Sequence, residues 1–275
     1  MNEKELMKIE NLNFSYGEGF SLKNINVSFS CGEKIAVLGS NGSGKSTFFL
    51  NINGVISHTD GNIYFNDNLI TRKNINLLRK GVGIVFQDAE NQMICSTVED
   101  EVAFGALNLG FEEDEVKKRT DSALEAMRIS HLKKNPVHYL SGGQKKSVSI
   151  ADILSMTPQI IIFDEPTASL DPVSCEMFED VLSRLEADNV TTLISTHDID
   201  FAYRWADRVL LFDNGEIIRD DIPQNIFKDT NLLKQTKLKK PLIAEICEML
   251  TEKGLVPENS DIRDITSLRK ILFSE

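Results

Sequence analysis

The stretch GSNGSGKST, at residues 39–47, constrains the fold of this chain more than any other part of its 275-residue sequence. It follows a short apolar run, IAVL at 35–38, and leads into a segment of helical character that begins at Lys45. The stretch matches the pattern G-x-x-x-x-G-K-[ST], in which glycines let the backbone wrap around a phosphate while a helix N-terminus points its N–H groups at it. The sequence therefore predicts a strand, a phosphate-binding loop and a helix in succession, which is the start of an α/β fold.

The end of this loop supplies the side chains that hold a nucleotide. Lys45 is expected to reach the β- and γ-phosphates, Ser46 to bind Mg²⁺, and Thr47 to hold another phosphate oxygen. A chance glycine turn is the alternative, and the order of strand, turn and helix argues against it. The predicted nucleotide-binding residues of the loop are Gly39, Ser40, Asn41, Gly42, Ser43, Gly44, Lys45, Ser46 and Thr47.

A second element of a nucleotide site is the stretch IIIFDE at 160–165. Asp164, at the C-terminal end of a predicted buried strand, is expected to hold Mg²⁺. Glu165 is well placed to polarise an attacking water as a general base. A solvated acidic turn before Pro166 is the structural alternative, and the presence of the phosphate loop argues against it.

Three further side chains support a nucleotide site only when they are considered together. Gln87 ends a predicted buried strand, and its amide can contact Mg²⁺ and orient water. His197 ends another such strand and can contact a γ-phosphate. Tyr16 follows the first strand and can stack on adenine. Each of these residues, taken alone, is more often structural.

The stretch YLSGGQKK, at 139–146, predicts a second helix start that is open to an anion. Ser141 is a suitable N-cap, and Gly142 and Gly143 leave backbone N–H groups bare. Because the chain already has one phosphate loop, this face, with Gln144, is expected to meet nucleotide bound to another subunit. An unusual N-cap with glycine flexibility is the alternative.

Composition narrows the class of protein. The net charge of −12 disfavours non-specific nucleic-acid binding, which depends on basic patches. The four cysteines lie far apart, so thiols are expected rather than a disulfide framework or a metal site. The N-terminus is charged and the longest apolar runs have the length of strands, so we expect a cytoplasmic location and any membrane role to act through partners.

The pattern along the chain predicts a core and an appendage. Apolar and polar residues alternate over 5–30, as in half-buried antiparallel strands, and 97–155 is helical. Two buried strands with a helix between them are expected over 159–198, and a hairpin around Asn214. We expect a core at 1–228 with a helical subdomain at about 88–155, and a small helical segment at 229–275.

Taken together, these motifs resemble the nucleotide-binding subunit of ATP-binding-cassette transporters over residues 5–228. In that family's terms, 39–47 is Walker A, Gln87 centres the Q-loop, LSGGQ is the signature, and 160–165 is Walker B. The resemblance adds a D-loop, Ser169-Leu170-Asp171, whose Asp171 is expected at the nucleotide. It implies an α/β fold with a P-loop NTPase core of mixed sheet and helices, an antiparallel β subdomain and an inserted helical subdomain. It also implies a head-to-tail dimer, in which two ATP molecules lie between Walker A of one subunit and the signature of the other.

The stretch 86–110 resembles more closely the ATPases of energy-coupling-factor transporters, particularly of the cobalt/nickel type. This implies a homodimer or a heterodimer with a paralogous ATPase, a transmembrane scaffold protein, a small substrate-capture membrane protein, and a C-terminal segment that helps hold the dimer. Ala89, Ser147 and Asp152 depart from that pattern without removing a catalytic role.

The leading hypothesis is therefore an ATPase that drives a cobalt or nickel importer from the cytoplasmic face of the membrane. Water-soluble vitamins as cargo, or an ordinary importer of the same superfamily, are the alternatives. DNA-repair ATPases of related type insert long coiled coils, and related translation factors carry two cassettes; this sequence shows neither.

Overall fold

A computed structural model shows the fold of residues 4–17, 19, 21–88, 92–168, 170–257 and 260–273. Ser169 of the predicted D-loop and Ala89 of the predicted Q-loop lie outside these described residues. Within the part of the chain that is described, no helix combines the length and apolar character that a membrane span requires.

The central layer is a six-stranded sheet with the strand order β10-β9-β3-β8-β7-β6. All neighbouring strands are parallel except β9 and β10, which form the predicted hairpin. The carboxyl ends of the parallel strands therefore meet at one edge, where ligands of open α/β sheets bind. The strands are β3 (Lys34–Leu38), β6 (Val82–Val85), β7 (Ile160–Asp164), β8 (Thr191–Ser195), β9 (Arg208–Asp213) and β10 (Glu216–Asp221).

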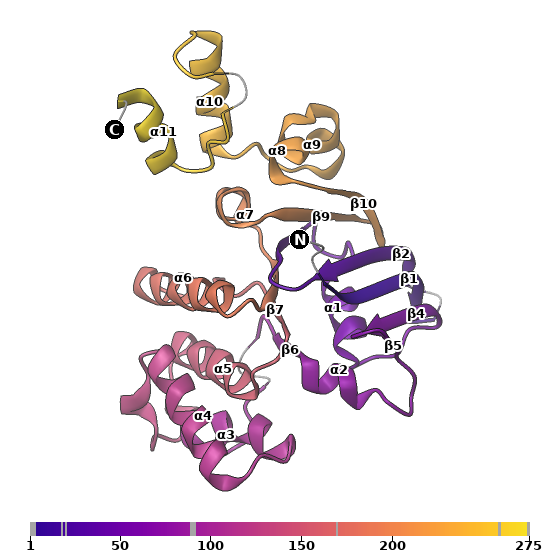
Figure 1. The fold of residues 1–275 in the computed structure, drawn as a ribbon, viewed down its shortest axis with the longest axis vertical. Coiled ribbons are helices and arrows are strands. Elements are labelled where there is room, and N and C mark those ends of the chain that lie inside the picture. The colour runs from indigo at the N-terminus through magenta and orange to yellow at the C-terminus, as the bar shows by residue number, and fades with distance from the viewer. Residues whose placement is uncertain are drawn as a thin grey trace.

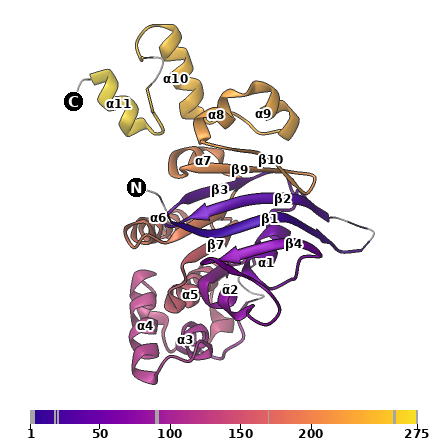
Figure 2. The ribbon, with the colours of Figure 1, turned by 45° about the vertical axis from the view of Figure 1, so that its right-hand side comes forward.

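A second sheet, with the order β2-β1-β4-β5, forms the layer seen at the front in Figure 2. Its main strands pair antiparallel, as the alternating pattern predicts. Helix α1 packs between the two sheets, because Phe48 contacts Phe29 of one sheet and Phe212 of the other, with ring centroids 6.5 and 5.2 Å apart. The elements are β1 (Glu5–Ser15), β2 (Ser21–Ser30), β4 (Asp60–Phe65), β5 (Asn68–Leu69), α1 (Lys45–Asn53) and α2 (Asn76–Gly81).

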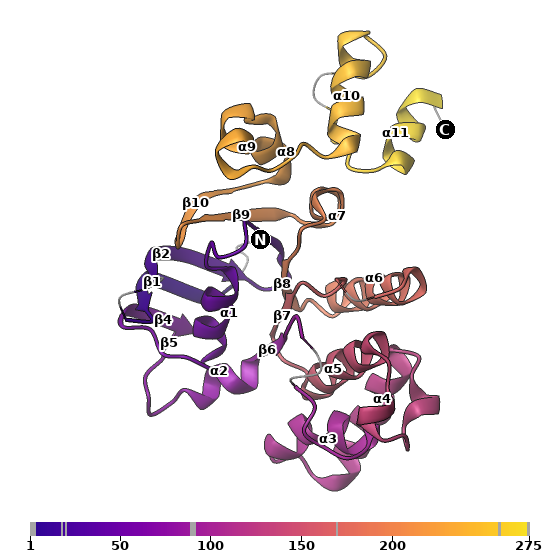
Figure 3. The same ribbon diagram turned by 180° about the vertical axis from the view of Figure 1, so that it is seen from behind.

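Helices α3, α4 and α5 form a separate lobe, at the opposite end of the molecule from α10 and α11 (Figures 1 and 3). Val116 and Leu124 of α4 and Met127 at its C-cap are buried in it. Helix α6 packs on the same hydrophobic cluster, through Phe178. The bounds are α3 (Val98–Asn108), α4 (Glu113–Ala126), α5 (Gly142–Met156) and α6 (Pro172–Ala187), with the short 3-10 helices η2 (Ser130–Leu132) and η3 (Val137–Tyr139).

The C-terminal helices pack on the core rather than standing apart from it. Leu233, Ile243 and Leu268 share one hydrophobic cluster with Leu38 and Leu211 of the central sheet. The short helices α2, α7 and α8 were not predicted, because six or seven residues give little helical periodicity. The bounds are α7 (Ile199–Trp205), α8 (Pro223–Lys228), α9 (Thr230–Thr236), α10 (Leu242–Glu252) and α11 (Ile265–Phe273).

Candidate ATP site

The loop between β3 and α1 has the conformation that its glycines allow. Gly39 has a φ of +146°, and a Cβ there would lie 2.3 Å from the carbonyl oxygen of Phe212. Gly44, the N-cap of α1, has a φ of +114°. The hairpin turn between β9 and β10 supports the loop from outside, because the N–H of Gly215 donates to the carbonyl of Ser43 at 2.9 Å. The loop is therefore held open around the N-terminus of α1.

Lys45 lies at the centre of this loop. Its Nζ donates to the carbonyl oxygens of Gly39 at 2.7 Å and of Ser40 at 3.2 Å. Burial lowers the pKa of Lys45, while Glu165 and Asp164 act in the opposite direction. A desolvated cation beside bare backbone N–H groups is an environment that favours phosphate oxygens.

Ser46 and Asp164 come together from separate elements. The hydroxyl of Ser46 donates to Oδ2 of Asp164 at 2.6 Å, and Gln87 lines the same cavity. A hydroxyl, a carboxylate and an amide oxygen are ligands of the kind that Mg²⁺ prefers. The residues present therefore fit this metal ion.

Glu165 adopts a strained and partly desolvated position. Its φ is +48°, a left-handed conformation that is costly for a residue with a side chain and is enriched at functional sites. Burial raises the pKa of Glu165, while His197 and Lys45 lower it. Oε1 of Glu165 has no hydrogen-bond partner among the described residues, and Nε2 of His197 lies 3.2 Å from it. This oxygen is available to accept a proton from water.

Sequence reasoning missed Ser195, which joins the two carboxylate residues. The Ser195 hydroxyl is buried, donates to Oδ1 of Asp164 at 2.5 Å and accepts from the N–H of Glu165 at 3.0 Å. Ser195 pairs with Asp164 in the parallel register of β7 and β8. Its place two residues before His197 at a strand end was the one available hint in the sequence.

The predicted residues fall into two groups. A cavity of about 670 Å³ brings together residues of the phosphate loop, both carboxylates, Gln87, His197 and Tyr16. Tyr16 is 59% exposed and lies nearly perpendicular to the ring of Phe14, with the ring centroids 4.7 Å apart, so its side chain is accessible for stacking. The described residues that line the cavity are Tyr16, Asn41, Gly42, Gly44, Lys45, Ser46, Thr47, Gln87, Asp164, Glu165 and His197. Neither the LSGGQ residues 140–144 nor Asp171 is among them.

The start of α5 differs in part from the expected bare helix end. Ser141 and Gln144 form a capping box: Gln144 N–H donates to Ser141 Oγ at 3.3 Å, and Ser141 N–H donates to Gln144 Oε1 at 3.0 Å. Among the described residues, no hydrogen bond engages the N–H groups of Gly142 or Gly143, and a Cβ on Gly142 would meet open space. Two donors thus remain available to an external anion.

Asp171 has a structural contact within the chain. It caps α6, because its Oδ1 accepts from the N–H of Ser174 at 2.8 Å, and these hydrogen bonds lower the pKa of Asp171. The residue is exposed, so the carboxylate remains accessible from outside the chain in addition to capping α6.

Comparison with known proteins agrees with this geometry. The description of the matching family is "ABC transporter", and the match spans residues 22–168, more than half of the chain. This chain belongs to the ABC transporter family. It is an ABC ATPase with the P-loop NTPase fold, as the motifs predicted.

This ABC ATPase has relatives of nearly its own length. It is 41% identical to the energy-coupling factor transporter ATP-binding protein EcfA3 of Clostridium perfringens, over 99% of this chain and 97% of the relative. It is 40% identical to the energy-coupling factor transporter ATP-binding protein EcfA of Methanococcus maripaludis, over 90% of each chain.

Two solved structures resemble this ABC ATPase closely. The first is cbiO1 from Clostridium perfringens, part of the ABC transporter complex cbiONQ, with 41% identity, a TM-score of 0.73, and 90% of this chain and 100% of that chain covered. The second is a dimeric ATP-binding cassette in a post-hydrolysis state, bound to ADP and Pi. It is 28% identical with a TM-score of 0.73, and the match covers 79% of this chain and 99% of that one.

Proposed function

We propose that this ABC ATPase pairs head to tail with a second cassette around two ATP molecules, and drives an energy-coupling-factor importer in the membrane. The observation that carries the proposal is the separation of the site into two groups. One cavity holds the phosphate loop, Gln87, Asp164, Glu165 and His197, whereas the LSGGQ segment does not line it. A second subunit would supply the missing anion-binding face.

The residues of the cavity support hydrolysis by in-line attack of water. Glu165 accepts a proton from the attacking water through Oε1, which has no hydrogen bond to the described residues, and its raised pKa makes it a better proton acceptor. Lys45 and His197 offer positive charge and a ring N–H to the γ-phosphate. Ser46, Asp164 and Gln87 would hold Mg²⁺, which neutralises phosphate charge when bound.

Exposed apolar side chains on the C-terminal helices support contact with a second ATPase subunit. Leu242, Met249 and Ile265 are each 58–63% exposed. Among the described residues, helix α10 buries only Ile243 and α11 only Leu268, and apolar side chains that stay exposed on such helices mark a surface for another protein. The second subunit is an identical chain or a paralogue.

The helical lobe offers a surface for the membrane partners. Ile94, Phe104 and Leu107 are 66, 39 and 51% exposed, and all three follow Gln87 in the chain. This is the segment whose sequence resembles the part of energy-coupling-factor ATPases that contacts a transmembrane scaffold. The chain would thus act at the cytoplasmic face of the membrane, with the scaffold and a small substrate-capture protein.

Cobalt or nickel ions are the cargo that we propose. The resemblance of 86–110 to the cobalt/nickel type supports this choice, as does the similarity to cbiO1 of the cbiONQ complex. Water-soluble vitamins are the second candidate, because the names of the EcfA relatives specify no cargo.

Replacement of the general base tests the proposed ATPase mechanism. We expect Glu165→Gln to lower the hydrolysis rate about a hundredfold or more and to trap a dimer with ATP and Mg²⁺. Light scattering and phosphate release measure the two effects, with Glu125→Gln on the exposed surface of α4 as a control. A population of monomers only, under these conditions, would contradict the proposal.

Isolation of the tagged chain from the membranes of its own cells tests the transporter. Mass spectrometry should identify a scaffold protein together with a small metal-capture protein. A vitamin-binding membrane protein instead would change the cargo and retain the mechanism. Recovery of soluble partners alone would refute the transporter role.

A further inference from the structure

A buried lysine lies between the signature helix and the Q-loop. Lys146, on α5, is only 2% exposed. Its Nζ donates to the carbonyl oxygen of Phe86 at 2.6 Å and to that of Gln87 at 3.1 Å. Burying an ammonium group is costly unless its donors are satisfied. The position of these two carbonyls is therefore tightly linked to the position of α5.

Ser149, one turn further along α5, makes a second link to the same loop. Its hydroxyl donates to Oε1 of Gln92 at 2.5 Å. The same oxygen of Gln92 accepts from the N–H of Phe86 at 3.2 Å. Lys146 and Ser149 lie on one face of the helix, since residues three apart are neighbours. One face of α5 thus contacts the loop before and after residues 89–91.

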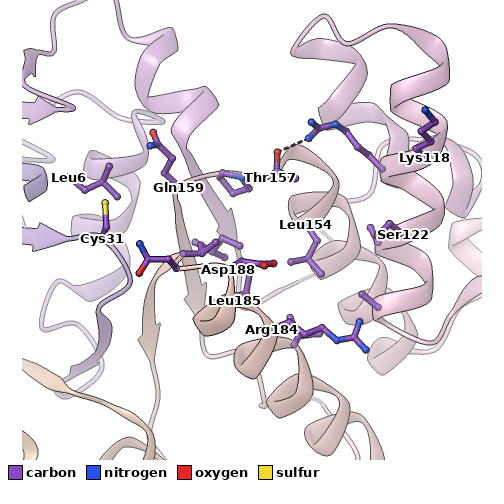
Figure 4. A pocket seen from close by; sticks show the side chains of 18 residues that line it. Leu6, Cys31, Lys118, Ser122, Leu154, Thr157, Gln159, Arg184, Leu185 and Asp188 are labelled. Carbon is purple, nitrogen blue, oxygen red and sulfur yellow. Dashed lines mark hydrogen bonds between the residues drawn. The ribbon is translucent and has the colours of Figure 1, made fainter. Parts of the chain in front are cut away.

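The lobe shares a hydrophobic cluster with the core, which includes Val85, Phe163 and Phe178, but a cavity separates the two on one side. A cavity of about 820 Å³ lies between α4, the ends of α5 and α6, and the second sheet, with Leu154, Arg184 and Asp188 on its walls (Figure 4). Figure 4 also shows Cys31 and Leu6 on the far wall, across this space from α4. Because the cavity leaves fewer side-chain contacts on that side, the contacts of α5 with the Q-loop are one route by which movement of the lobe reaches the core.

We propose that Lys146 is a positioning residue that couples the signature helix to Gln87. This inference rests on the proposed head-to-tail dimer, in which the N-terminus of α5 meets the partner's ATP. When α5 moves to engage that nucleotide, Lys146 carries the backbone of Gln87 with it. The state of one ATP site thereby sets the position of the Q-loop in the other.

The test compares Lys146→Met, which keeps the length of the side chain and removes the donors, with Lys146→Gln, which keeps an N–H donor. We expect Lys146→Met to lower kcat about tenfold while KM for ATP changes less than about twofold, and Lys146→Gln to recover part of the loss. Lys118→Met, on the exposed face of α4, is the matched control. Equal losses in kcat and ATP affinity, or a kcat within about twofold of wild type, would overturn the proposal.

Hydrogen exchange of residues 82–88 provides a readout that a purely structural role would not change. In the Glu165→Gln background, ATP should slow exchange of this segment when Lys146 is present and leave it unchanged in Lys146→Met. If Lys146→Met fails to fold, Ser149→Ala should show a smaller effect of the same kind, and its absence would refute the coupling. Failure of the Glu165→Gln parent to dimerise would instead refute the proposed function.

Discussion

At the scale of single residues, the site depends on one buried hydroxyl as much as on the charged groups. Ser195 holds Asp164 by one hydrogen bond and the backbone of Glu165 by another. Glu165 is in a left-handed conformation that a residue with a side chain does not adopt without support. Ser195 therefore fixes the orientation of the proposed metal ligand and supports the strained residue that we propose as general base.

Removal of this hydroxyl should affect metal binding and turnover together. We expect Ser195→Ala to raise the Mg²⁺ concentration for half-maximal activity about tenfold, because a hydrogen bond to a buried carboxylate is lost. Ser195→Thr, which keeps the hydroxyl, should stay close to wild type. Titration of ATPase activity with Mg²⁺ measures the effect, and an unchanged midpoint in Ser195→Ala would show that Asp164 needs no such support.

At the scale of elements, α5 combines several tasks along fifteen residues. Its N-terminus offers open N–H groups, its middle contacts the Q-loop through Lys146, and its last turns pack against α3. Burial lowers the pKa of Lys146 to about 8. Burial, reinforced by Glu101, raises the pKa of Asp152 to about 7. A helix with two desolvated charged groups is less stable than an apolar one would be.

Asp152 should make the stability of this protein depend on pH. Its folded pKa is raised, so the unfolded chain ionises first, and stability falls between about pH 4 and pH 7 and stays low above. Asp152→Asn removes this penalty. We expect it to raise the free energy of unfolding by on the order of 1–2 kcal/mol more at pH 8 than at pH 5.5.

Urea denaturation at the two pH values measures this difference. Asp114→Asn, which changes an exposed carboxyl in the same lobe, should have equal effects at both. If Asp152→Asn also had equal effects at both, the Asp152 carboxyl would not be desolvated in solution.

At the scale of the whole molecule, the chain presents half-sites rather than a complete site. The phosphate cavity lies at the edge of the central sheet, and the signature lies at the start of a helix in the separate lobe (Figure 1). The C-terminal helices share a hydrophobic cluster with the central sheet, so they are part of the same folded unit. In the function that we propose, a second cassette completes each site.

A substitution at the signature tests this arrangement. We expect Ser141→Arg to abolish most ATP hydrolysis while the affinity for ATP stays within about twofold, because the proposed dimer has Ser141 act on nucleotide held by the partner. Ser130→Arg, elsewhere on the exposed surface of the lobe, is the control. A parallel loss of ATP binding in Ser141→Arg would place the signature in the chain's own site.

The sequence alone predicted the phosphate loop, the strand ends that carry Asp164 and Glu165, and the family. These features depend on backbone conformation over a few residues: glycines at 39 and 44, a helix that begins at Lys45, and apolar runs of strand length. Such local patterns are encoded in consecutive residues, so they can be recognised without knowledge of the fold.

Only the tertiary structure decided which distant residues meet. The link of Ser195 to Asp164 spans 31 positions, and that of Lys146 to Phe86 spans 60. The sequence indicated Ser141 as an N-cap, but only the structure showed that Gln144 caps it in return and that the C-terminal helices bury side chains against β9. Such contacts arise from the packing of elements that are remote in the chain, where burial and hydrogen-bond satisfaction, rather than local propensity, select the partners.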